Sequence, residues 1–501
     1  MGRLWRPLSE SRPSPMAEIF MRSANLERPF LSEPSARIRA HILALLLALV
    51  GAMIAATAIY APVRTVVALG GLLSVGLTWL MRRRAWFLLC WVVIPAIGAG
   101  ELWMVEIGGG TLITPSLFVV AVWATGFFLA VLFEKDQSFW RLPLLGSFAV
   151  FWLAILLSVI NSVSVLHWAR GLLEAILGFA FFAYPNVYLK NREQLSVCLR
   201  VLSWLAVFTV VFGVLQYSAF DSFRSLFPFL YPKAGIAIIE IWQAQGRMVA
   251  NWLHPSDFGS LLNIVAPIAL YSWLNSRKNR LVPLLVFLLI ATGIFLTATR
   301  TPIIAFCLSS ALLCFLMRGR RAGLLIMTGA AILLLLGPSL FSLASQRFQF
   351  SEEENVETLQ GRSLLWLEAV SFFVQHPAVG IGARNFPDRT QAYPGIMQNT
   401  HNVYLETAAE TGAIGLLAFI YLLYRALRVD FNGAKTRLPR ELQNLRYALL
   451  CSSLAIMVES VTDNDFYVWQ VWCLFWLIRG LSAAIAARPE AFVGNHATAT
   501  A

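Results

Sequence analysis

The chain has 501 residues, of which 58% are hydrophobic and 13% charged, and its mean hydropathy is +0.68. This composition excludes a soluble globular domain, whose surface would need more charge, and is typical of a polytopic membrane protein. The formal net charge of +12 could indicate a nucleic-acid partner. However, the basic residues stand between the hydrophobic runs, as the positive-inside rule expects, so no nucleic-acid partner is predicted.

The two ends of the chain differ from the apolar middle. Residues 1–39 are rich in Arg, Pro and Ser and carry no short apolar core followed by a cleavage site. We therefore expect a disordered cytoplasmic arm there and a disordered cytoplasmic tail at 485–501. All six cysteines fall in apolar segments, so no disulfide is expected.

Long apolar runs predict an all-α fold, a polytopic transmembrane helix bundle with about fourteen spans, or about twelve as the alternative. The first spans make an N-terminal membrane region at 40–194, and residues 195–484 make a membrane core with long external loops at 218–256 and 343–402. The predicted spans lie near 40–60, 65–81, 85–104, 112–133, 142–160, 170–189, 195–217, 257–275, 281–299, 301–317, 322–342, 403–424, 446–462 and 466–484.

Basic residues concentrate in every second loop, which orients the bundle. With the N-terminus in the cytoplasm, the cytoplasmic loops hold Arg82–Arg84, Lys135 with Arg141, Lys190 with Arg192, Arg277 to Arg280, Arg318 to Arg321, and Arg425 to Arg446. The short loops on the other side hold little beyond Arg64, Arg170 and Arg300. We therefore predict that both termini are cytoplasmic and that the two long loops are external.

The second external loop is predicted to be partly helical. It begins with the acidic run Glu352–Glu354, which is typical of a solvated surface. Residues 362–377 then place Leu365, Ala369, Phe372 and Phe373 on one helical face, and Pro377 ends the helix. We expect this helix to lie on the membrane surface.

His401 is the leading candidate for chemistry, because it stands with Asn402 at the start of the apolar stretch 401–418. Its imidazole titrates near neutrality and could take a proton from a sugar hydroxyl. A helix N-terminus there would favour an anionic leaving group. The alternative is a structural histidine at a membrane interface.

The helix that follows His401 limits which side chains could assist it. Leu405, Ala408, Gly412 and Gly415 share its face and predict a smooth stripe for close helix contact. In a continuous helix, Glu406 and Glu410 lie on the other side and would serve packing or a second subsite.

Two arginines predicted to be external suit a diphosphate, because each guanidinium offers a planar fork of donors. Arg300 ends the predicted span at 281–299 in the sequence LTATRTP, and Arg247 lies in the first long loop. The alternatives are an arginine that snorkels to the interface at 300 and an ordinary surface arginine at 247.

Three further patterns could carry chemistry. Asp463-Asn464-Asp465 resembles the paired-aspartate metal site of nucleotide-sugar transferases, but the predicted orientation puts it outside, where nucleotide sugars are absent. Turn chemistry before proline accounts for His254 and His376. The sequence has no Walker loop, dinucleotide fingerprint or zinc-spaced cluster, so neither a metal nor a cofactor is predicted.

The spacing after His401 is similar to a known signature. His401-Asn402, nine residues, Gly412, Gly415 and Ala418 resemble the H-[N/S/Q]-x9-G-x-x-G-x-x-[small] signature of the O-antigen ligase and polymerase superfamily. GRMVANWLHPSDFG resembles the family's arginine and "GTF.HPN..A" element, and LTATRTP its "LT.SRG" span end, which carries the two family arginines onto Arg247 and Arg300. RSLLWLEAVSFFVQHPAVGIGARNF resembles the loop ahead of the histidine. The similarity covers about residues 195–484.

The resemblance implies a metal-independent, inverting glycosyltransferase on the periplasmic face of a bacterial inner membrane. Its donor would be a glycan on undecaprenyl diphosphate, and its acceptor a glycan or lipid A core, with membrane lipid around it. Arg247 and Arg300 would hold the diphosphate and His401 would act on the acceptor hydroxyl or the departing phosphate. Asn402, Glu406, Glu410 and Arg362 are candidate supporting residues.

Two rival functions stay open. The signature favours a ligase, but a polymerase that adds the chain to the next lipid-linked repeat unit would use the same residues. A polysaccharide flippase or exporter would also be basic with about fourteen spans, but should show two related halves and charges near mid-membrane.

Overall fold

The computed structural model describes most of the chain after residue 138. Described residues are 139–226, 233–250, 252, 254–276, 279–318, 359–392, 398–432 and 438–493, with separate positions between 105 and 131. They belong to one compact unit, Leu73–Ala501. The arm at 1–39, the acidic run at 352–354, the predicted spans at 40–60, 65–81, 85–104 and 322–342, and most of the span at 112–133 lie outside them.

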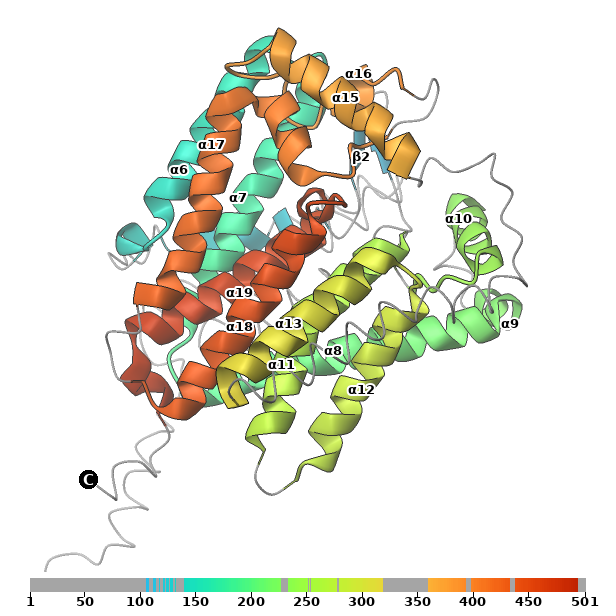
Figure 1. Cartoon of the computed structure of the whole chain (residues 1–501). Helices are drawn as coiled ribbons and strands as arrows, with labels where there is room; N and C mark the ends of the chain where they lie inside the picture. Colours follow the sequence, from blue (N-terminus) through green and yellow to red (C-terminus); the bar gives the residue numbers. More distant parts are fainter. Residues whose placement is uncertain are drawn as a thin grey trace, which may run out of the picture. The chain divides into compact units, whose positions relative to one another are not determined.

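The described residues are almost entirely helical, as predicted (Figure 1). The α-helices are α6 (Leu145–Leu157), α7 (Val165–Tyr188), α8 (Arg192–Ser218), α9 (Phe220–Leu226), α10 (Lys233–Ala244), α11 (Pro255–Asn275), α12 (Leu281–Leu296), α13 (Arg300–Arg318), α15 (Leu359–Gln375), α16 (Phe386–Arg389), α17 (Val403–Asn432), α18 (Arg440–Glu459) and α19 (Trp469–Ala487). The 3-10 turns are η1 (Phe139–Arg141), η2 (Ser158–Asn161), η6 (Asp465–Tyr467) and η7 (Pro489–Phe492). One short antiparallel pair, β1 (Val105–Ile107) with β2 (Thr111–Ile113), was not predicted.

Several helices are suited to a bilayer. Among the described residues, the six helices α7, α8, α11, α13, α17 and α19 are long and apolar enough to cross a membrane, and two shorter apolar helices cover 145–161 and 281–296. Every predicted span from 142–160 onward that falls in the described residues coincides with a helix. The chain is therefore an integral membrane protein built from helices.

Successive helices run in opposite directions and gather their connections at two ends. At the first end, which we call the site end, hydrogen bonds join Asn161 to Gly380, Met248 to Leu296, and Ser256 to Asp463. At the opposite end, they join Arg192 to Glu441, Arg425 to Pro143, and Arg488 to Asn186. The described parts of both long loops lie at the site end.

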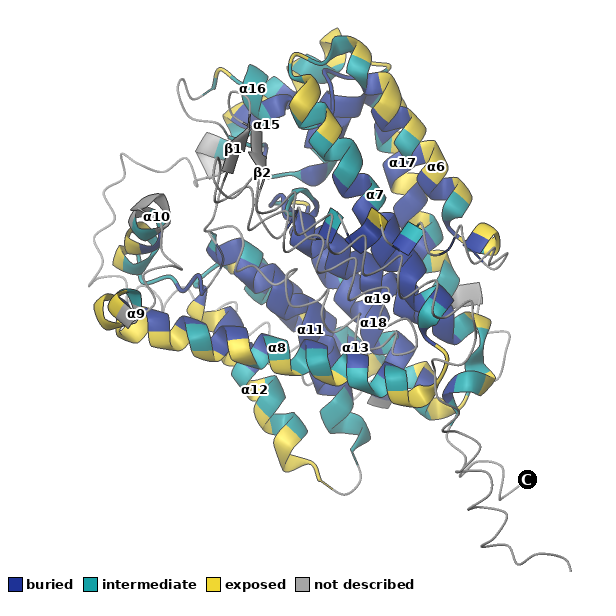
Figure 2. Ribbon diagram, turned by 180° about the vertical axis from the view of Figure 1, so that it is seen from behind, coloured by how far each residue is buried: buried dark blue, intermediate teal, exposed yellow. Residues whose placement is uncertain are grey.

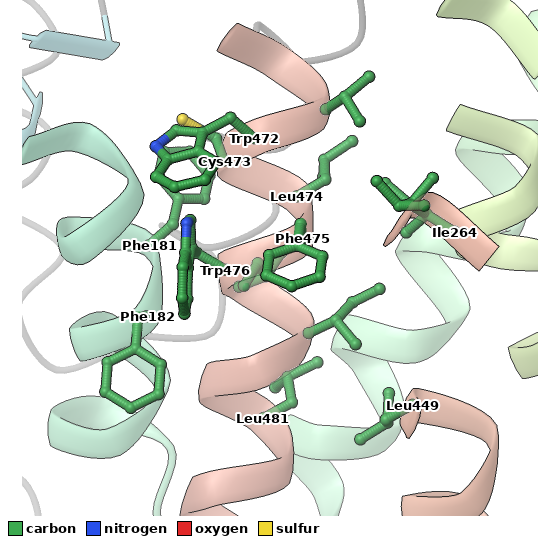
Figure 3. Close-up of a cluster of buried hydrophobic side chains, with 14 of the residues drawn as sticks. Phe181, Phe182, Ile264, Leu449, Trp472, Cys473, Leu474, Phe475, Trp476 and Leu481 are labelled. Atoms are coloured by element: carbon green, nitrogen blue, oxygen red, sulfur yellow. The ribbon is translucent and has the colours of Figure 1, made fainter. Parts of the chain in front are cut away.

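Helix α19 lies at the centre of the packing. In Figure 3 its Trp472, Phe475 and Trp476 lie among side chains from neighbouring helices, with Phe181 of α7 on one side and Ile264 of α11 on the other. Burial of its most apolar stretch reaches 89%, against 33% for α8, whose exposed residues appear in Figure 2. Because lipid is as apolar as these side chains, close packing holds α19 in place.

Glycines set the distance between α7 and α19. A Cβ on Gly178 would lie 2.2 Å from Nε1 of Trp472, and one on Gly480 would lie 2.4 Å from the carbonyl oxygen of Phe182. Small residues at such crossings let two backbones approach in a membrane. This contact fixes the start of α19, and with it the connection from α18.

Two segments contain helical structure that was not predicted. The loop at 218–256 contains α9 and α10, whose short apolar faces pack on each other through Phe220 and Ile239. The tail does not become irregular at 485, because α19 continues to Ala487 and η7 follows with Phe492 fully buried. Burial of these apolar side chains offsets the entropy cost of ordering both segments.

Candidate active site

The candidate site is built around residues 460–468, the connection between α18 and α19. Its backbone and side chains receive contacts from α11, α13, α15 and α17. The predicted site residues His401, Arg300 and Arg362 all lie at or next to one of these contacts. Helices distant in sequence thus meet at one short segment.

His401 precedes helix α17. The prediction that its side chain shares a helical face with Leu405 requires a helix that is continuous from His401, and α17 begins only at Val403. The φ of His401 is 52°, in the left-handed region that L-residues rarely adopt. Asn402 supports this turn, because its side chain accepts a 3.0 Å hydrogen bond from the backbone N–H of Leu405. The turn leaves the His401 side chain 16% exposed and directs its Nδ1 toward the 460–468 segment.

Asp463 is the partner of His401. Nδ1 of His401 lies 3.5 Å from Oδ1 of Asp463, at the outer limit for a hydrogen bond, and Ser256 donates its hydroxyl to Oδ2. Burial raises the pKa of Asp463, but His401, the charge of His254 and the Ser256 hydroxyl together lower it below its usual value. An ionised Asp463 favours the proton on Nδ1 and leaves Nε2 as the basic nitrogen.

Glu406 forms hydrogen bonds with one sequence neighbour of each residue in the His401–Asp463 pair. Its Oε2 accepts 2.9 Å hydrogen bonds from the backbone and the hydroxyl of Thr400, and a 2.8 Å bond from Asn464. Thr400 precedes His401 and Asn464 follows Asp463, so one buried carboxylate fixes both backbones. Glu406 therefore positions the pair through its neighbours.

Helix α17 breaks at Gly412, so the prediction of a smooth glycine stripe was wrong there. Gly412 has φ 66° and ψ −168°, which is not helical. A Cβ at this position would lie 2.4 Å from the carbonyl oxygen of Ala378. The amide of Ala413 donates instead to the carbonyl of Pro377 at 2.8 Å, and the amide of Gly382 donates to the carbonyl of Glu410 at 2.9 Å. Because Gly412 has no side chain, the second loop can approach and hydrogen-bond to the backbone of α17 at the break.

The side chain of Glu410 also binds the second loop at this break in α17. Its Oε1 accepts a 3.0 Å hydrogen bond from the amide of Phe386, and its Oε2 accepts a 2.8 Å bond from the hydroxyl of Tyr467. Glu410 is 1% exposed and is satisfied by these donors. It links the second loop to the 460–468 segment, which is a positioning role.

Arg300 and Arg247 lie near each other at the site end. Arg300 is the exposed first residue of α13, and α12 ends earlier at Leu296, so its predicted place at the end of the preceding span was wrong. Nη2 of Arg247 donates to Oγ1 of Thr299 at 3.1 Å, and its guanidinium lies 4.6 Å from the ring of Trp242. Arg247 therefore contacts the residue that precedes Arg300.

The start of α13 also contacts the 460–468 segment. Oγ1 of Thr301 lies 3.0 Å from Oγ1 of Thr462, and Nη1 of Arg362 donates to the carbonyl of Thr462. Two arginine-bearing segments, the start of α13 and the start of α15, thus contact Thr462, which precedes Asp463. Guanidiniums arranged this way could neutralise a diphosphate at one side while His401 stands at the other.

Comparison with known proteins bears on this arrangement. Residues 285–420 match the family model described as O-Antigen ligase. This segment is similar to the O-antigen ligase family. It carries Arg300, Arg362 and His401, together with Gly412 at the helix break, and it confirms the resemblance to the ligase and polymerase superfamily. No curated protein sequence matches the chain.

Helix α15 of the O-antigen ligase segment has the predicted apolar face. Leu365 and Ala369 are buried, and the ring of Phe372 lies 5.7 Å from that of Phe386. This face packs on α17, and Nε1 of Trp366 donates to the carbonyl of Thr400 at 2.9 Å. The helix thereby stabilises the turn that carries His401.

Two carboxyl groups, those of Glu459 and Asp465, meet at the Ser260 hydroxyl behind the candidate site. The single hydroxyl hydrogen of Ser260 faces Oε2 of Glu459 at 2.6 Å and Oδ1 of Asp465 as well. Ser260 also faces the carbonyl of Ser256 and can donate to only one acceptor at a time, so a proton on one of the carboxyls would prevent bare carboxylates from facing the same oxygen. Burial raises the pKa of Asp465, and the charges of Glu459 and Asp463 raise it further. Asp463 stays ionised beside a partly protonated pair.

A small cavity lies next to the candidate site. It has a volume of about 70 Å³ and is lined by Glu174, Arg384, Glu410 and Tyr467 among other residues. Arg384 donates to Glu174 and lies 4.4 Å from the Tyr467 ring. The space can hold a few water molecules, since each needs about 10–15 Å³, and it is too small for a sugar.

Sequence reasoning missed the role of Asp463 and its support by Ser256. The signal was visible as an Asp-Asn-Asp run between two predicted spans, but it was compared only with a metal site. In the structure Asn464 and Asp465 face Glu406 and Ser260, respectively. Among the described residues, no group of His, Cys, Asp or Glu gathers in a metal-binding arrangement.

Proposed function

We propose that the protein transfers a glycan from undecaprenyl diphosphate to an acceptor hydroxyl, as an O-antigen ligase, at the periplasmic face of a bacterial inner membrane. The observation that carries this proposal is that Arg362, His401 and the start of α13 after Arg300 all contact residues 460–468, while Arg247 contacts Thr299, which precedes Arg300. Both chain termini would then be cytoplasmic, with about fourteen spans.

The arginines would bind the donor through its diphosphate. Guanidiniums keep their charge at any working pH and match phosphate oxygens with paired donors. Arg300 is exposed at the start of α13, and Trp242 and Thr299 hold Arg247 beside it. Positive charge fixed in advance at the leaving group lowers the barrier without reorganisation during the reaction.

His401 would act as the general base. The acceptor oxygen attacks the anomeric carbon while Nε2 of His401 takes the hydroxyl proton, and the bond from that carbon to the diphosphate oxygen breaks. The diphosphate leaves as an anion between the arginines, and the single displacement inverts the anomeric centre. Asp463 stabilises the imidazolium that forms.

Reconstitution tests the function directly. The purified chain is placed in proteoliposomes with a lipid-linked oligosaccharide and two acceptors, lipid A core or a second lipid-linked unit, and products are resolved by mass spectrometry. We expect transfer to lipid A core with inverted anomeric configuration and no loss in EDTA. Extension of the second lipid-linked unit would identify a polymerase instead, and export without transfer would identify a flippase.

A further inference from the structure

The opposite end of the bundle contains a hollow that the transfer reaction does not use. Two adjoining cavities, of about 280 and 640 Å³, open between α8, α11 and α18 and share Asn275, Ser276 and Glu441. We call this space the arginine hollow. Ser256, which contacts Asp463, lies at the start of α11 and Asn275 at its end, so helix geometry separates hollow and site by roughly 30 Å.

The hollow is strongly basic. Arg192 and Arg200 line the first cavity, Arg280 and Arg440 line the second, and Glu441 is the acid in their linings. Glu441 is paired with Arg192. Arg200 and Arg280 each donate to a carbonyl four residues earlier, Arg200 Nε to Ser196 and Arg280 Nε to Ser276. Most of the positive charge therefore has no acidic partner in the lining.

The remaining lining is amphipathic. Hydroxyl and amide groups of Ser196, Ser203, Ser272, Asn275 and Asn444 lie among the arginines. Apolar side chains make up the rest, from Leu195, Leu199, Leu274, Leu442, Leu445 and Met317. A small soluble anion would contact only the arginines and the hydroxyl and amide groups. A phospholipid would contact these with its head group and the apolar side chains with its acyl chains.

We propose that the arginine hollow binds the head group of an anionic phospholipid from the leaflet at that end, with the start of its acyl chains against the leucines. The positive-inside rule places arginines at this end of the bundle, but it does not require them to line a cavity with hydroxyl donors. Basic pockets between membrane helices are suited to phosphate-bearing head groups. The proposal is independent of the glycan transfer.

Lipid binding can be measured on the intact chain. The purified protein in neutral detergent is titrated with phosphatidylglycerol, phosphatidylcholine or inorganic phosphate, and the melting midpoint and bound lipid are followed. We expect phosphatidylglycerol alone to raise the midpoint. The double variant R200Q/R280Q should bind it roughly tenfold to thirtyfold more weakly, because each arginine near an anionic head group contributes to binding.

A matched control separates the hollow from general charge. R425Q/R428Q removes the same charge from the same end of the bundle, on α17, where neither residue lines the hollow. We expect this variant to bind as wild type does, and R200K/R280K to retain most binding. Equal weakening by both glutamine variants, equal stabilisation by phosphatidylcholine, or saturation by inorganic phosphate would each overturn the proposal. Size-exclusion profiles confirm that every variant is folded.

Discussion

The two ends of the bundle use charge differently. At the site end Asp463, Glu406 and Glu410 are buried and bonded across helices. At the opposite end Arg200 and Arg280 are exposed, and each donates a hydrogen bond to a carbonyl four residues earlier. Buried groups fix one another, so a change there alters geometry and chemistry. Exposed groups act separately, so a change there should alter only what binds to them.

The largest effect should come from the histidine. His401→Ala should reduce glycan transfer by roughly a hundredfold to ten-thousandfold, because it removes the general base. Initial rates in proteoliposomes at equal protein abundance measure this. His376→Ala removes a histidine from the end of α15 without touching the 460–468 segment and should retain activity. Near-normal transfer by His401→Ala would exclude the proposed base.

The helix break should be the most sensitive structural feature. Gly412→Ala places a side chain at a positive φ and 2.4 Å from the Ala378 carbonyl, so it should cost at least about 2 kcal/mol of stability. Melting in detergent measures the loss. Gly146→Ala in α6 meets nothing within 4 Å and should leave the midpoint unchanged or slightly raised. Equal midpoints for both variants would mean that the break is not needed.

Charge geometry can be separated from charge itself at α13. Arg300→Lys keeps the positive charge but loses the planar fork, so transfer should fall roughly tenfold to a hundredfold, mainly through weaker donor binding. The dependence of initial rate on donor concentration measures this. Arg425→Lys, at the opposite end, is the control. Full activity of Arg300→Lys would leave the arginine as an anchor at the membrane interface.

The same substitution at the two aspartates of the site end should have effects of different size. Asp463→Asn should lower transfer roughly tenfold and shift its pH profile, because it removes the charge that favours a basic Nε2. Asp465→Asn should change transfer less than about threefold, since an amide replaces a carboxyl that is held protonated. Rates measured across pH compare the two. Equal losses would mean that the carboxyl pair does not hold its proton.

Asp463 and Asp465 should contribute to stability with opposite dependence on pH. The lowered pKa of Asp463 stabilises the fold above the unfolded pKa of about 3.9, and this contribution is lost as pH falls through the folded value. The raised pKa of Asp465 means that the folded state keeps a proton which the unfolded chain has lost. Its contribution therefore decreases as pH rises above about 3.9. Asp465→Asn should remove that decrease in a melting series.

The sequence predicted the helices well and the contacts between them poorly. Apolar runs located α7, α11 and α17, because period and length are local properties. The Gly412 break was missed because Pro377 and Ala378, about thirty-five residues earlier, insert there. The Asp463 role was missed for the same reason, since Ser256 and His401 reach it from other helices. Such pairings are not encoded in spacing.

The central claim is that Arg247 and Arg300 bind the diphosphate while His401 acts on the acceptor hydroxyl. Binding of undecaprenyl diphosphate without a glycan tests this claim most directly. Affinity is measured for wild type, Arg247→Gln, Arg300→Gln and His401→Ala in nanodiscs. We expect each arginine variant to bind roughly tenfold or more weakly, and His401→Ala to bind as wild type does. Unchanged affinity in both arginine variants would contradict the account.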